Sequence, residues 1–219
     1  MSITAAARRP LRRYVEHVMG MPVSLALRGR HAATEEGRAA WAAVMTELAE
    51  VELIFSTYRT DSVISGLDRG ELDLAHCPAE VAELLALAER ASRESGGAFS
   101  TSLPTPGETD GCHRLDPSGV VKSWAAERAA RHLARLDDTD FCLSAGGDIT
   151  CCADGHSAPW RIGIETRTAR PGSSPWSRCA TVRSPRPAPR TAAPTSSTPG
   201  PGLTSTGVAW ATVVAPSLT

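Results

Sequence analysis

The C-terminal quarter of the sequence contains no aspartate, glutamate or lysine, and this absence divides the chain into two chemically different parts. From Arg167 to Thr219 the only charged residues are six arginines, and nine of the sixteen prolines lie there. Residues 1–166 carry all 24 acidic side chains and 17 basic ones, a net charge of −7. Because residues 167–205 include few large apolar residues and many prolines, we expect this stretch to be poorly ordered. The acidic body predicts no nucleic-acid partner.

Two further absences restrict the class of protein. Residues 1–13 carry four arginines, but no apolar run follows them, so the sequence predicts neither a secretory signal nor a transmembrane segment. We therefore expect a cytoplasmic protein. The six cysteines contain no Cys-x-x-Cys pair, which argues against a zinc site. Cys142 lies in an apolar stretch and is expected to be a buried small hydrophobic residue.

Hydrophobic periodicity predicts three helices. Apolar residues recur at helical spacing over residues 34–55, 78–95 and 123–136. Proline at the start of the second stretch and the pair Gly96-Gly97 after it are typical helix boundaries.

Strands are expected in separate runs. The sequence predicts two short strands between Val15 and Leu27, and one each at Phe141–Ala145 and Arg161–Glu165, with a loop over residues 102–111. Because helices and strands do not alternate as βαβ units, the predicted fold class is α+β. We expect one domain at residues 14–165, followed by the tail at 166–219.

One segment combines features that bind phosphate. Asp116 ends an extended stretch, the small-residue turn Pro117-Ser118-Gly119 follows, and Lys122 begins an Ala-rich helix. The N–H groups of a helix N-terminus attract anions, and the lysine adds a full charge. On local chemistry alone, an ordinary turn with a helix cap fits equally well. The later segment Gly146-Gly147-Asp148 is, by itself, more typical of a hairpin turn than of a binding site.

Together with their neighbours, these segments resemble the FAD:protein FMN transferase (ApbE-type) family. Its pattern is Asp-Leu-Gly-Gly-Ile-Ala-Lys-Gly-Tyr-Ala-x-Asp, then a helix, a strand ending in Gly-Gly-Asp, and Trp-x-Ile-Gly-Ile. The corresponding segments here are Asp116–Glu127, Gly146–Asp148 and Trp160–Ile164. Upstream, Val18–Pro22 resembles the family's Met-Gly-Thr, Phe55–Ser62 resembles its Ser-x-Tyr-x-x-x-Ser, and Gly97–Ser100 resembles its Gly-Ala-Phe-Asp. The resemblance runs from about Val15 to Glu165.

The resemblance implies a Mg²⁺-dependent enzyme. It would cleave the pyrophosphate of its substrate FAD, pass FMN to a Thr or Ser hydroxyl of an acceptor flavoprotein, and release AMP. Such phosphoryl transfer requires a cradle for the phosphates, a divalent ion and an in-line nucleophile.

The resemblance also implies the site residues. Those lining the flavin or adenine pocket would be Met19, Tyr58, Ala98, Phe99 and Ser100. Those contacting FAD near its phosphates or ribose would be Asp116 and Lys122, and the carbonyl of Gly119 would bind the metal.

Simpler alternatives exist for three of the matched residues. Tyr58 fits a half-buried aromatic at a strand end, and Phe99 fits a core residue. Glu127, where the family has Asp, fits a solvated helix residue.

The sequence also departs from the family. Ser100 replaces the Asp of Gly-Ala-Phe-Asp, Met21 replaces the Thr of Met-Gly-Thr, and Pro117-Ser118 replaces Leu-Gly. The family's late segment with side-chain ligands for Mg²⁺ has no counterpart, so we expect impaired activity. Two alternatives remain open, namely a non-catalytic flavin-binding remnant and an FAD pyrophosphatase that uses water as the acceptor.

The tail has a second interpretation in terms of its reading frame. Each residue fixes most of the first two bases of its codon, and the third base is often free. If the codons of Thr181–Gly202 are translated in the frame that starts at the third base of each codon, they can encode Gly-Ala-Val-Ala-Thr-Ser-Gly-Thr-Ala-His-Arg-Gly-Ala-His-Leu-Val-Asp-Pro-Arg-Thr-Gly. The family carries Ala-Thr-Ser-Gly and then His-Ile-x-Asp-Pro-x-Thr-Gly in this region. We therefore interpret the segment as translated or sequenced out of frame. The frame is restored at Gly207–Pro216, which resembles the family's late strand.

Overall fold

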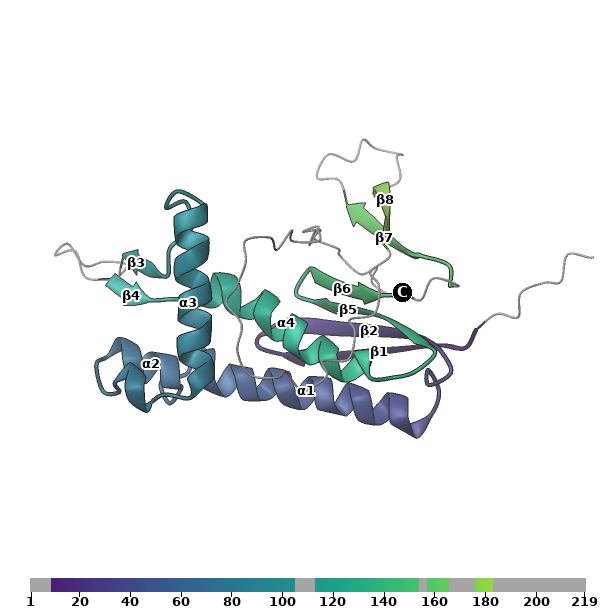
Figure 1. The fold of residues 1–219 in the computed structure, drawn as a ribbon, viewed down its shortest axis with the longest axis horizontal. Coiled ribbons are helices and arrows are strands. Elements are labelled where there is room, and N and C mark those ends of the chain that lie inside the picture. Colours follow the sequence, from purple (N-terminus) through teal and green to yellow (C-terminus); the bar gives the residue numbers. More distant parts are fainter. Residues whose placement is uncertain (1–8, 105–112, 154–156, 166–175, 183–219) are drawn as a thin grey trace, which may run out of the picture.

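An antiparallel sheet forms the centre of the protein in a computed structural model, which describes residues 9–104, 113–153, 157–165 and 176–182 (Figure 1). The sheet has four strands in the order β1-β2-β5-β6, and each neighbouring pair is antiparallel. Their bounds are Leu11–Val18, Met21–Gly29, Thr139–Ala145 and Asp148–Cys152. Two helices, α1 (Glu35–Phe55) and α4 (Ser118–Ala134), cover one face of this sheet and pack against each other.

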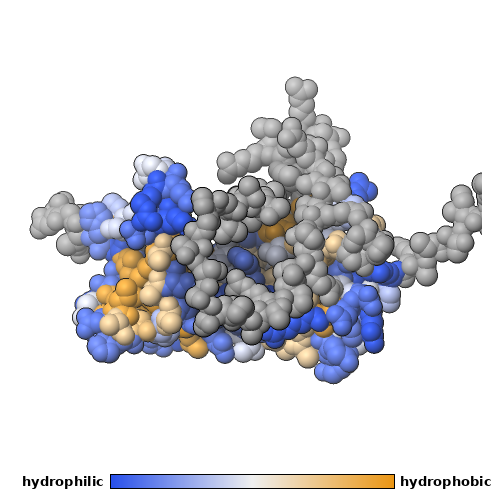
Figure 2. All heavy atoms as spheres, viewed as in Figure 1, coloured by the Kyte–Doolittle hydropathy of each residue, from blue (hydrophilic) through white to orange (hydrophobic). Residues whose placement is uncertain are grey.

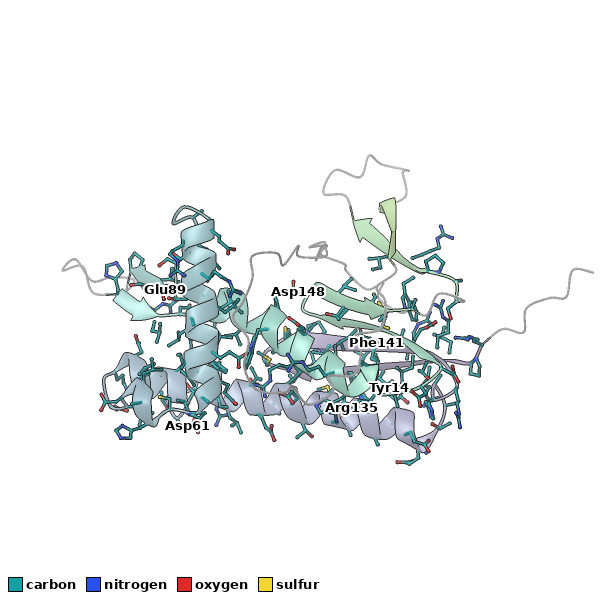
Figure 3. The ribbon with its side chains drawn as sticks, in the orientation of Figure 1. Tyr14, Asp61, Glu89, Arg135, Phe141 and Asp148 are labelled. Carbon is teal, nitrogen blue, oxygen red and sulfur yellow. The ribbon has the colours of Figure 1, made fainter. Side chains whose placement is uncertain are left out.

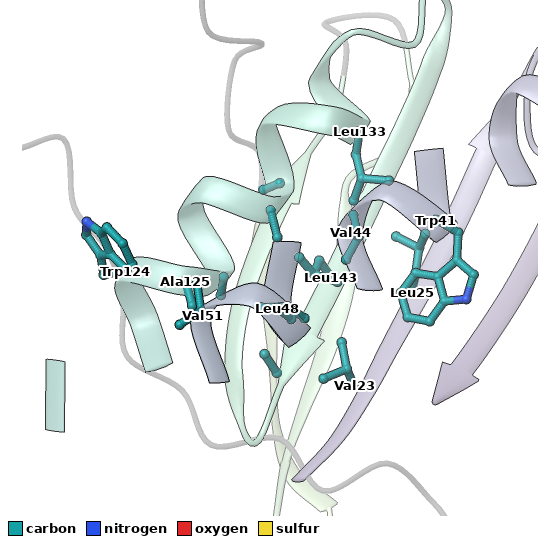
Figure 4. Packing of buried hydrophobic residues seen from close by; sticks show 14 of the residues in the cluster. Val23, Leu25, Trp41, Val44, Leu48, Val51, Trp124, Ala125, Leu133 and Leu143 are labelled. Atoms are coloured by element: carbon teal, nitrogen blue, oxygen red, sulfur yellow. The ribbon is translucent and has the colours of Figure 1, made fainter. Parts of the chain in front are cut away.

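The core lies between the sheet and these two helices (Figure 4). Alternate residues of β2 and β5 point toward the helices, as the period of a strand requires. The buried apolar residues of this layer are Val23, Leu25, Leu27, Phe141, Leu143 and Ala145. Their partners on α1 and α4 are Val44, Leu48, Val51, Ala125, Ala129 and Leu133. Full burial of a leucine side chain contributes about 1.5–3 kcal/mol, so this contact holds the two layers together.

An ion cluster ties α4 to its neighbouring helices. An Arg128 guanidinium nitrogen lies 2.7 Å from Glu47 Oε1 on α1, and another lies 3.7 Å from Glu80 Oε2 on α3 (Ala79–Glu94). His132 Nε2 lies 3.3 Å from Glu47 Oε2. The guanidinium also stacks over the Trp124 ring, with its carbon 4.5 Å from the ring centroid. These contacts fix the C-terminal half of α4 against α1 and α3.

Smaller elements lie at the two ends of the layer (Figure 1). At one end are α2 (Val63–Asp68), a 3₁₀ turn (Leu74–His76), α3 (Ala79–Glu94), β3 (Ser102–Pro104) and β4 (His113–Leu115). Near the other end is the hairpin of β7 (Trp160–Glu165) and β8 (Trp176–Val182). Figure 2 shows apolar surface gathered over the α2–α3 end, where Leu72 and Leu74 are 40% and 43% exposed. Among the described helices, none is long and apolar enough to cross a bilayer.

The predicted helices are all present, and one begins earlier than predicted. Helices α1 and α3 match the predicted stretches 34–55 and 78–95 within one residue at each end. Helix α4 begins at Ser118 rather than at residue 123. The expected small-residue turn is therefore the first turn of the helix, because Pro117 has no N–H to satisfy and suits a helix start.

The α+β class is confirmed, and several short elements were not predicted. Strands β1, β2, β5 and β7 match predicted strands, with boundaries shifted by a few residues, and β4 lies in the extended stretch expected before Asp116. Strand β6, helix α2, the 3₁₀ turn, and β3 within the expected loop were not predicted. Strand β8 lies inside the tail, where we expected no regular structure. The tail beyond residue 182, including Gly207–Pro216, lies outside the described residues.

Candidate functional site

A cleft of about 560 Å³ opens where three distant parts of the sequence meet. The first is the turn between β1 and β2, the second is the end of α1 with the loop after it, and the third is the start of α4. The lining residues are Met19, Gly20, Met21, Glu52, Phe55, Ser56, Thr57, Tyr58, Arg59, Ser118, Val121 and Lys122. Met19, Tyr58 and Lys122, which the family resemblance assigned to the site, therefore line one cavity.

The β1–β2 turn reaches the cleft in an unusual backbone conformation. Met19 and Gly20 both have positive φ angles, 55° and 67°. This pair of left-handed residues gives the tight turn that matches the twist of a two-residue hairpin. For a residue with a side chain the left-handed region costs about 1 kcal/mol, so something must hold Met19 there. Its N–H donates a hydrogen bond to Glu52 Oε2 at 3.1 Å, from the last turn of α1.

Lys122 brings a positive charge to the cleft from the second turn of α4. It is the only lysine of the chain. Its Nζ donates to the carbonyl oxygen of Gly146 at 3.2 Å and lies 3.9 Å from Asp148 Oδ2. The Ser123 hydroxyl donates to the same carboxylate oxygen at 3.1 Å. The lysine side chain remains 40% exposed, so a ligand can reach its ammonium group.

Gly146 and Gly147 form the turn of the β5–β6 hairpin. Their φ angles are 55° and 100°, the left-handed conformations that this turn requires. The hairpin interpretation of Gly146-Gly147-Asp148 is therefore confirmed, and the same turn contacts Lys122. Figure 3 shows Asp148 at the start of β6, facing α4. A Cβ on Gly146 would lie 2.6 Å from Met21 Sδ and 3.3 Å from Lys122 Cδ, so only glycine fits without displacing them.

Tyr58 presents its ring to solvent at the rim of the cleft. The residue is 96% exposed, so the alternative of a half-buried aromatic at a strand end is wrong. The loop that carries it is held by serines. Ser62 Oγ donates to the Ser56 carbonyl at 2.7 Å and accepts the Ser65 N–H at 3.1 Å, which caps α2. An exposed aromatic on a fixed loop offers a stacking surface for a planar ring.

The remaining assigned residues lie beside the cleft rather than on its surface. Phe99 packs against the first turn of α4, where a Cβ on Gly119 would lie 2.8 Å from its ring. Ala98 precedes it in the loop after α3, and the Ser100 hydroxyl accepts the Ser102 N–H at 3.1 Å. Phe99 is half-buried and is not among the residues of the hydrophobic core.

Asp116 organises the start of α4. Its Oδ1 accepts hydrogen bonds from the N–H and the hydroxyl of Ser118, at 3.1 and 2.5 Å. Its Oδ2 pairs with Arg114 at 3.2 Å, and its own N–H donates to the Thr101 carbonyl at 2.7 Å. The carboxylate thus stabilises the positive end of the helix dipole, as the capping interpretation predicts.

The described residues do not by themselves fit a Mg²⁺ ion. Gly119 lies inside α4, where a helical carbonyl accepts the N–H four residues later. Mg²⁺ requires about six oxygen ligands in octahedral geometry. Within the part of the chain that the structure describes, no three His, Cys, Asp or Glu side chains lie close enough to hold a metal ion. The assignment of Gly119 as a metal ligand stays a prediction.

Of the residues that line the cleft, Glu52 is the one that sequence reasoning missed, because all the others lie in segments that carry the family resemblance. Glu52 had a detectable signal, because it lies between Val51 and Phe55 at the end of the buried stripe of α1. A carboxylate at that position needs a partner, and here the partner is the β1–β2 turn.

The arrangement of α1 and α4 on the four-stranded sheet is the fold of solved flavin transferases. The chain aligns with the apo flavinyl transferase ApbE of Pseudomonas stutzeri at 18% identity, covering 74% of this chain and 67% of that one, with a TM-score of 0.60. The ApbE protein of Thermotoga maritima gives 15% identity, 80% and 68% coverage, and a TM-score of 0.64. The H257G mutant of the Vibrio cholerae flavin transferase ApbE gives 17% identity, 71% and 64% coverage, and a TM-score of 0.58.

The chain belongs to the ApbE family, whose model matches residues 19–105 and 107–192. This confirms the resemblance to FAD:protein FMN transferases. The match extends past the body into the first part of the tail. The chain spans about two thirds of the length of the solved transferases. No curated protein matches it in sequence.

Proposed function

We propose that the cleft binds FAD and that the protein is an FMN transferase, which passes FMN to a Thr or Ser hydroxyl of an acceptor flavoprotein. The observation that carries the proposal is the convergence of Lys122, the N-terminus of α4 and the Met19-Gly20 turn on one cavity. An adenine dinucleotide needs a positive region for its pyrophosphate and flat or apolar surfaces for its rings. The cleft offers both.

The pyrophosphate is assigned to Lys122 and the start of α4. The N–H groups of a helix N-terminus and a lysine ammonium group stabilise negative charge together. Charge that develops on the phosphate oxygens during cleavage would be stabilised by the same groups. Asp116 fixes the first turn of the helix by accepting the Ser118 N–H, so this N–H is not offered to the phosphates.

A ring of FAD is assigned to the other side of the cleft. Tyr58 offers an exposed aromatic face, and Met19 and Met21 offer polarizable apolar surface next to it. Ala98, Phe99 and Ser100 would contribute to the flavin or adenine pocket from the loop that packs against Gly119, at the start of α4. Transfer is expected to depend on Mg²⁺, as the resemblance implies.

A transfer assay tests the proposal. The protein is incubated with FAD, an acceptor peptide containing Thr, and either Mg²⁺ or a chelator, and the peptide mass is then measured. The matched control is the same peptide with Ala in place of Thr. Two versions are compared, the printed sequence and one in which the reading frame of 181–202 is corrected.

We expect covalent FMN on the Thr peptide from the corrected version and FAD binding with little transfer from the printed sequence. Free FMN and AMP without peptide modification would identify a pyrophosphatase. Bound, intact FAD with both versions would identify a non-catalytic flavin-binding protein. Sequencing the gene across codons 166–207 tests the frame itself, because the interpretation requires one insertion or deletion that shifts the frame and a second that restores it.

A further inference from the structure

Two cysteines face each other across the β5–β6 hairpin, away from the proposed nucleotide cleft. Cys142 and Cys151 are register partners in this antiparallel pair, and their Sγ atoms lie 3.1 Å apart. Residues directly opposite in such a pair have Cα atoms about 4.5–5.5 Å apart. That separation falls within the roughly 4.4–6.8 Å range that a disulfide spans. The backbone therefore already has the spacing for a bond between these two sulfurs.

The neighbouring cysteine cannot take the place of Cys151. Cys152 follows it in β6, so its side chain points to the opposite face of the sheet. It pairs in register with Phe141 and belongs to the hydrophobic core under α1 and α4. Cys142 and Cys151 lie on the outer face instead. The expectation that Cys142 is a buried core residue is therefore wrong, because it is half-buried and faces away from the core.

The two thiols are chemically unequal. The Cys151 thiol donates a hydrogen bond to Cys142 Sγ, which lowers the pKa of Cys142 below its ordinary value although burial opposes this. The same contact and burial raise the pKa of Cys151. The thiolate is the reactive form of cysteine. Cys142, the more exposed of the two, is thus suited to react first with an external disulfide, and Cys151 is placed to attack the mixed disulfide that forms on Cys142.

We propose that Cys142 and Cys151 are a redox-active pair that a low-molecular-weight disulfide, such as oxidised glutathione, converts to an intramolecular disulfide. The Cys142 thiolate attacks one sulfur of the oxidant, forms a mixed disulfide and releases one thiol. Cys151 then loses its proton, attacks Cys142 Sγ and displaces the second thiol. Two cysteine thiols are oxidised, and one external disulfide is reduced to two thiols.

The bond would close the hairpin whose turn contacts Lys122. The two cysteines flank the Gly146-Gly147 turn and are nine residues apart. A cross-link at this position restricts the relative movement of β5 and β6. Formation of the disulfide would thereby affect the position of the Gly146 carbonyl, which accepts a hydrogen bond from the Lys122 ammonium group.

Peptide mapping of the full chain tests the proposal without reference to flavin chemistry. The protein is treated with oxidised glutathione, its remaining thiols are blocked with N-ethylmaleimide, and it is cleaved before aspartate residues. Cys142 then lies in the peptide 140–147, and Cys151 and Cys152 lie in the peptide 148–153. We expect these two peptides to be joined, with fragmentation placing the bond at Cys151 and a loss of two free thiols.

Variants assign the partner. In C152S the two peptides should remain joined, and in C151S they should separate, with Cys142 carrying glutathione. Circular dichroism of each variant reports whether it folds, and fragmentation of the wild-type peptides decides the partner even where a variant does not fold. Complete maleimide labelling of Cys142 and Cys151 after oxidation would overturn the proposal. A bond to Cys152, or stable glutathione on wild-type Cys142, would also overturn it.

Discussion

The carboxylate of Glu52 accepts the main-chain N–H of Met19 at 3.1 Å, and this bond joins the last turn of α1 to the β1–β2 turn. Met19 has a φ angle of 55°, a conformation that a methionine adopts only at a cost. Both residues line the cleft. The long helix α1 thus supports both the core and the shape of the proposed nucleotide site.

Removing the Glu52 carboxylate should therefore loosen the cleft. We expect Glu52→Ala to weaken FAD binding, because the Met19 N–H loses its acceptor and the strained turn loses its support at a cost of about 1–3 kcal/mol. Glu52→Gln retains an acceptor and should bind FAD nearly as wild type does. Glu50→Ala, at an exposed position of the same helix, is the matched control. Equal affinities in a flavin fluorescence titration of all variants would contradict the role of Glu52.

The glycine at the β5–β6 turn should be required for the site as well as for the turn. Gly146→Ala places a methyl group against Met21 and Lys122, while Gly70→Ala adds one where no atom lies within 4 Å. Both positions have positive φ, 55° and 70°, so each variant should lose about 1 kcal/mol of stability from backbone strain. Only Gly146→Ala should also weaken FAD binding. Unfolding curves and FAD titrations of the pair separate the two effects, and equal FAD affinity would argue against contact between this turn and the site.

The ion pair between Asp140 and Arg28, on the face of the sheet away from α1 and α4, should contribute more to the free energy of unfolding than an exposed ion pair. Asp140 is 1% exposed and accepts two hydrogen bonds from Arg28, at 3.1 and 2.9 Å. The Arg28 guanidinium stacks over the Trp160 ring at 4.3 Å. Asp140→Ala leaves this arginine without its carboxylate and should cost about 3 kcal/mol. Glu35→Ala, which removes an exposed partner of Arg38, should cost at most about 0.5 kcal/mol. Urea unfolding of both variants checks the difference, and similar losses would refute it.

Lys122→Ala should weaken FAD binding by about 1.5–3 kcal/mol through loss of a charge-assisted contact. Arg135→Ala is the control, because Arg135 carries the same charge at the opposite end of α4 (Figure 3). That substitution should leave the affinity unchanged. A similar loss in both variants would show that net charge, rather than the position of Lys122, governs binding.

The elements that the sequence predicts well are those with a local signal. Helices α1 and α3 have an apolar stripe and recognisable ends within their own sequence. The start of α4 was misjudged, because Pro117-Ser118-Gly119 is compatible with a free turn and with a first helical turn. Strand β6 is short, and its pairing with β5 is what makes it a strand.

The site was only partly predictable for the same reason. The family motifs identify Met19, Tyr58 and Lys122 one at a time, and the fold brings them to one cavity. The contact between Glu52 and Met19 joins residues 33 positions apart. The pairing of Cys142 with Cys151 depends on the register of two strands, of which only one was predicted. Such relationships follow from tertiary packing, which no local pattern contains.

Chemical labelling of Lys122 tests most directly whether this cleft is the FAD site. Because Lys122 is the only lysine, the amines that acetic anhydride can modify are its side chain and the N-terminal amine, and the second serves as an internal reference. The account predicts that saturating FAD slows acetylation of Lys122, measured by mass spectrometry of its peptide, while the N-terminal amine reacts at an unchanged rate. An equal rate of Lys122 acetylation with and without FAD would contradict the assignment of the cleft.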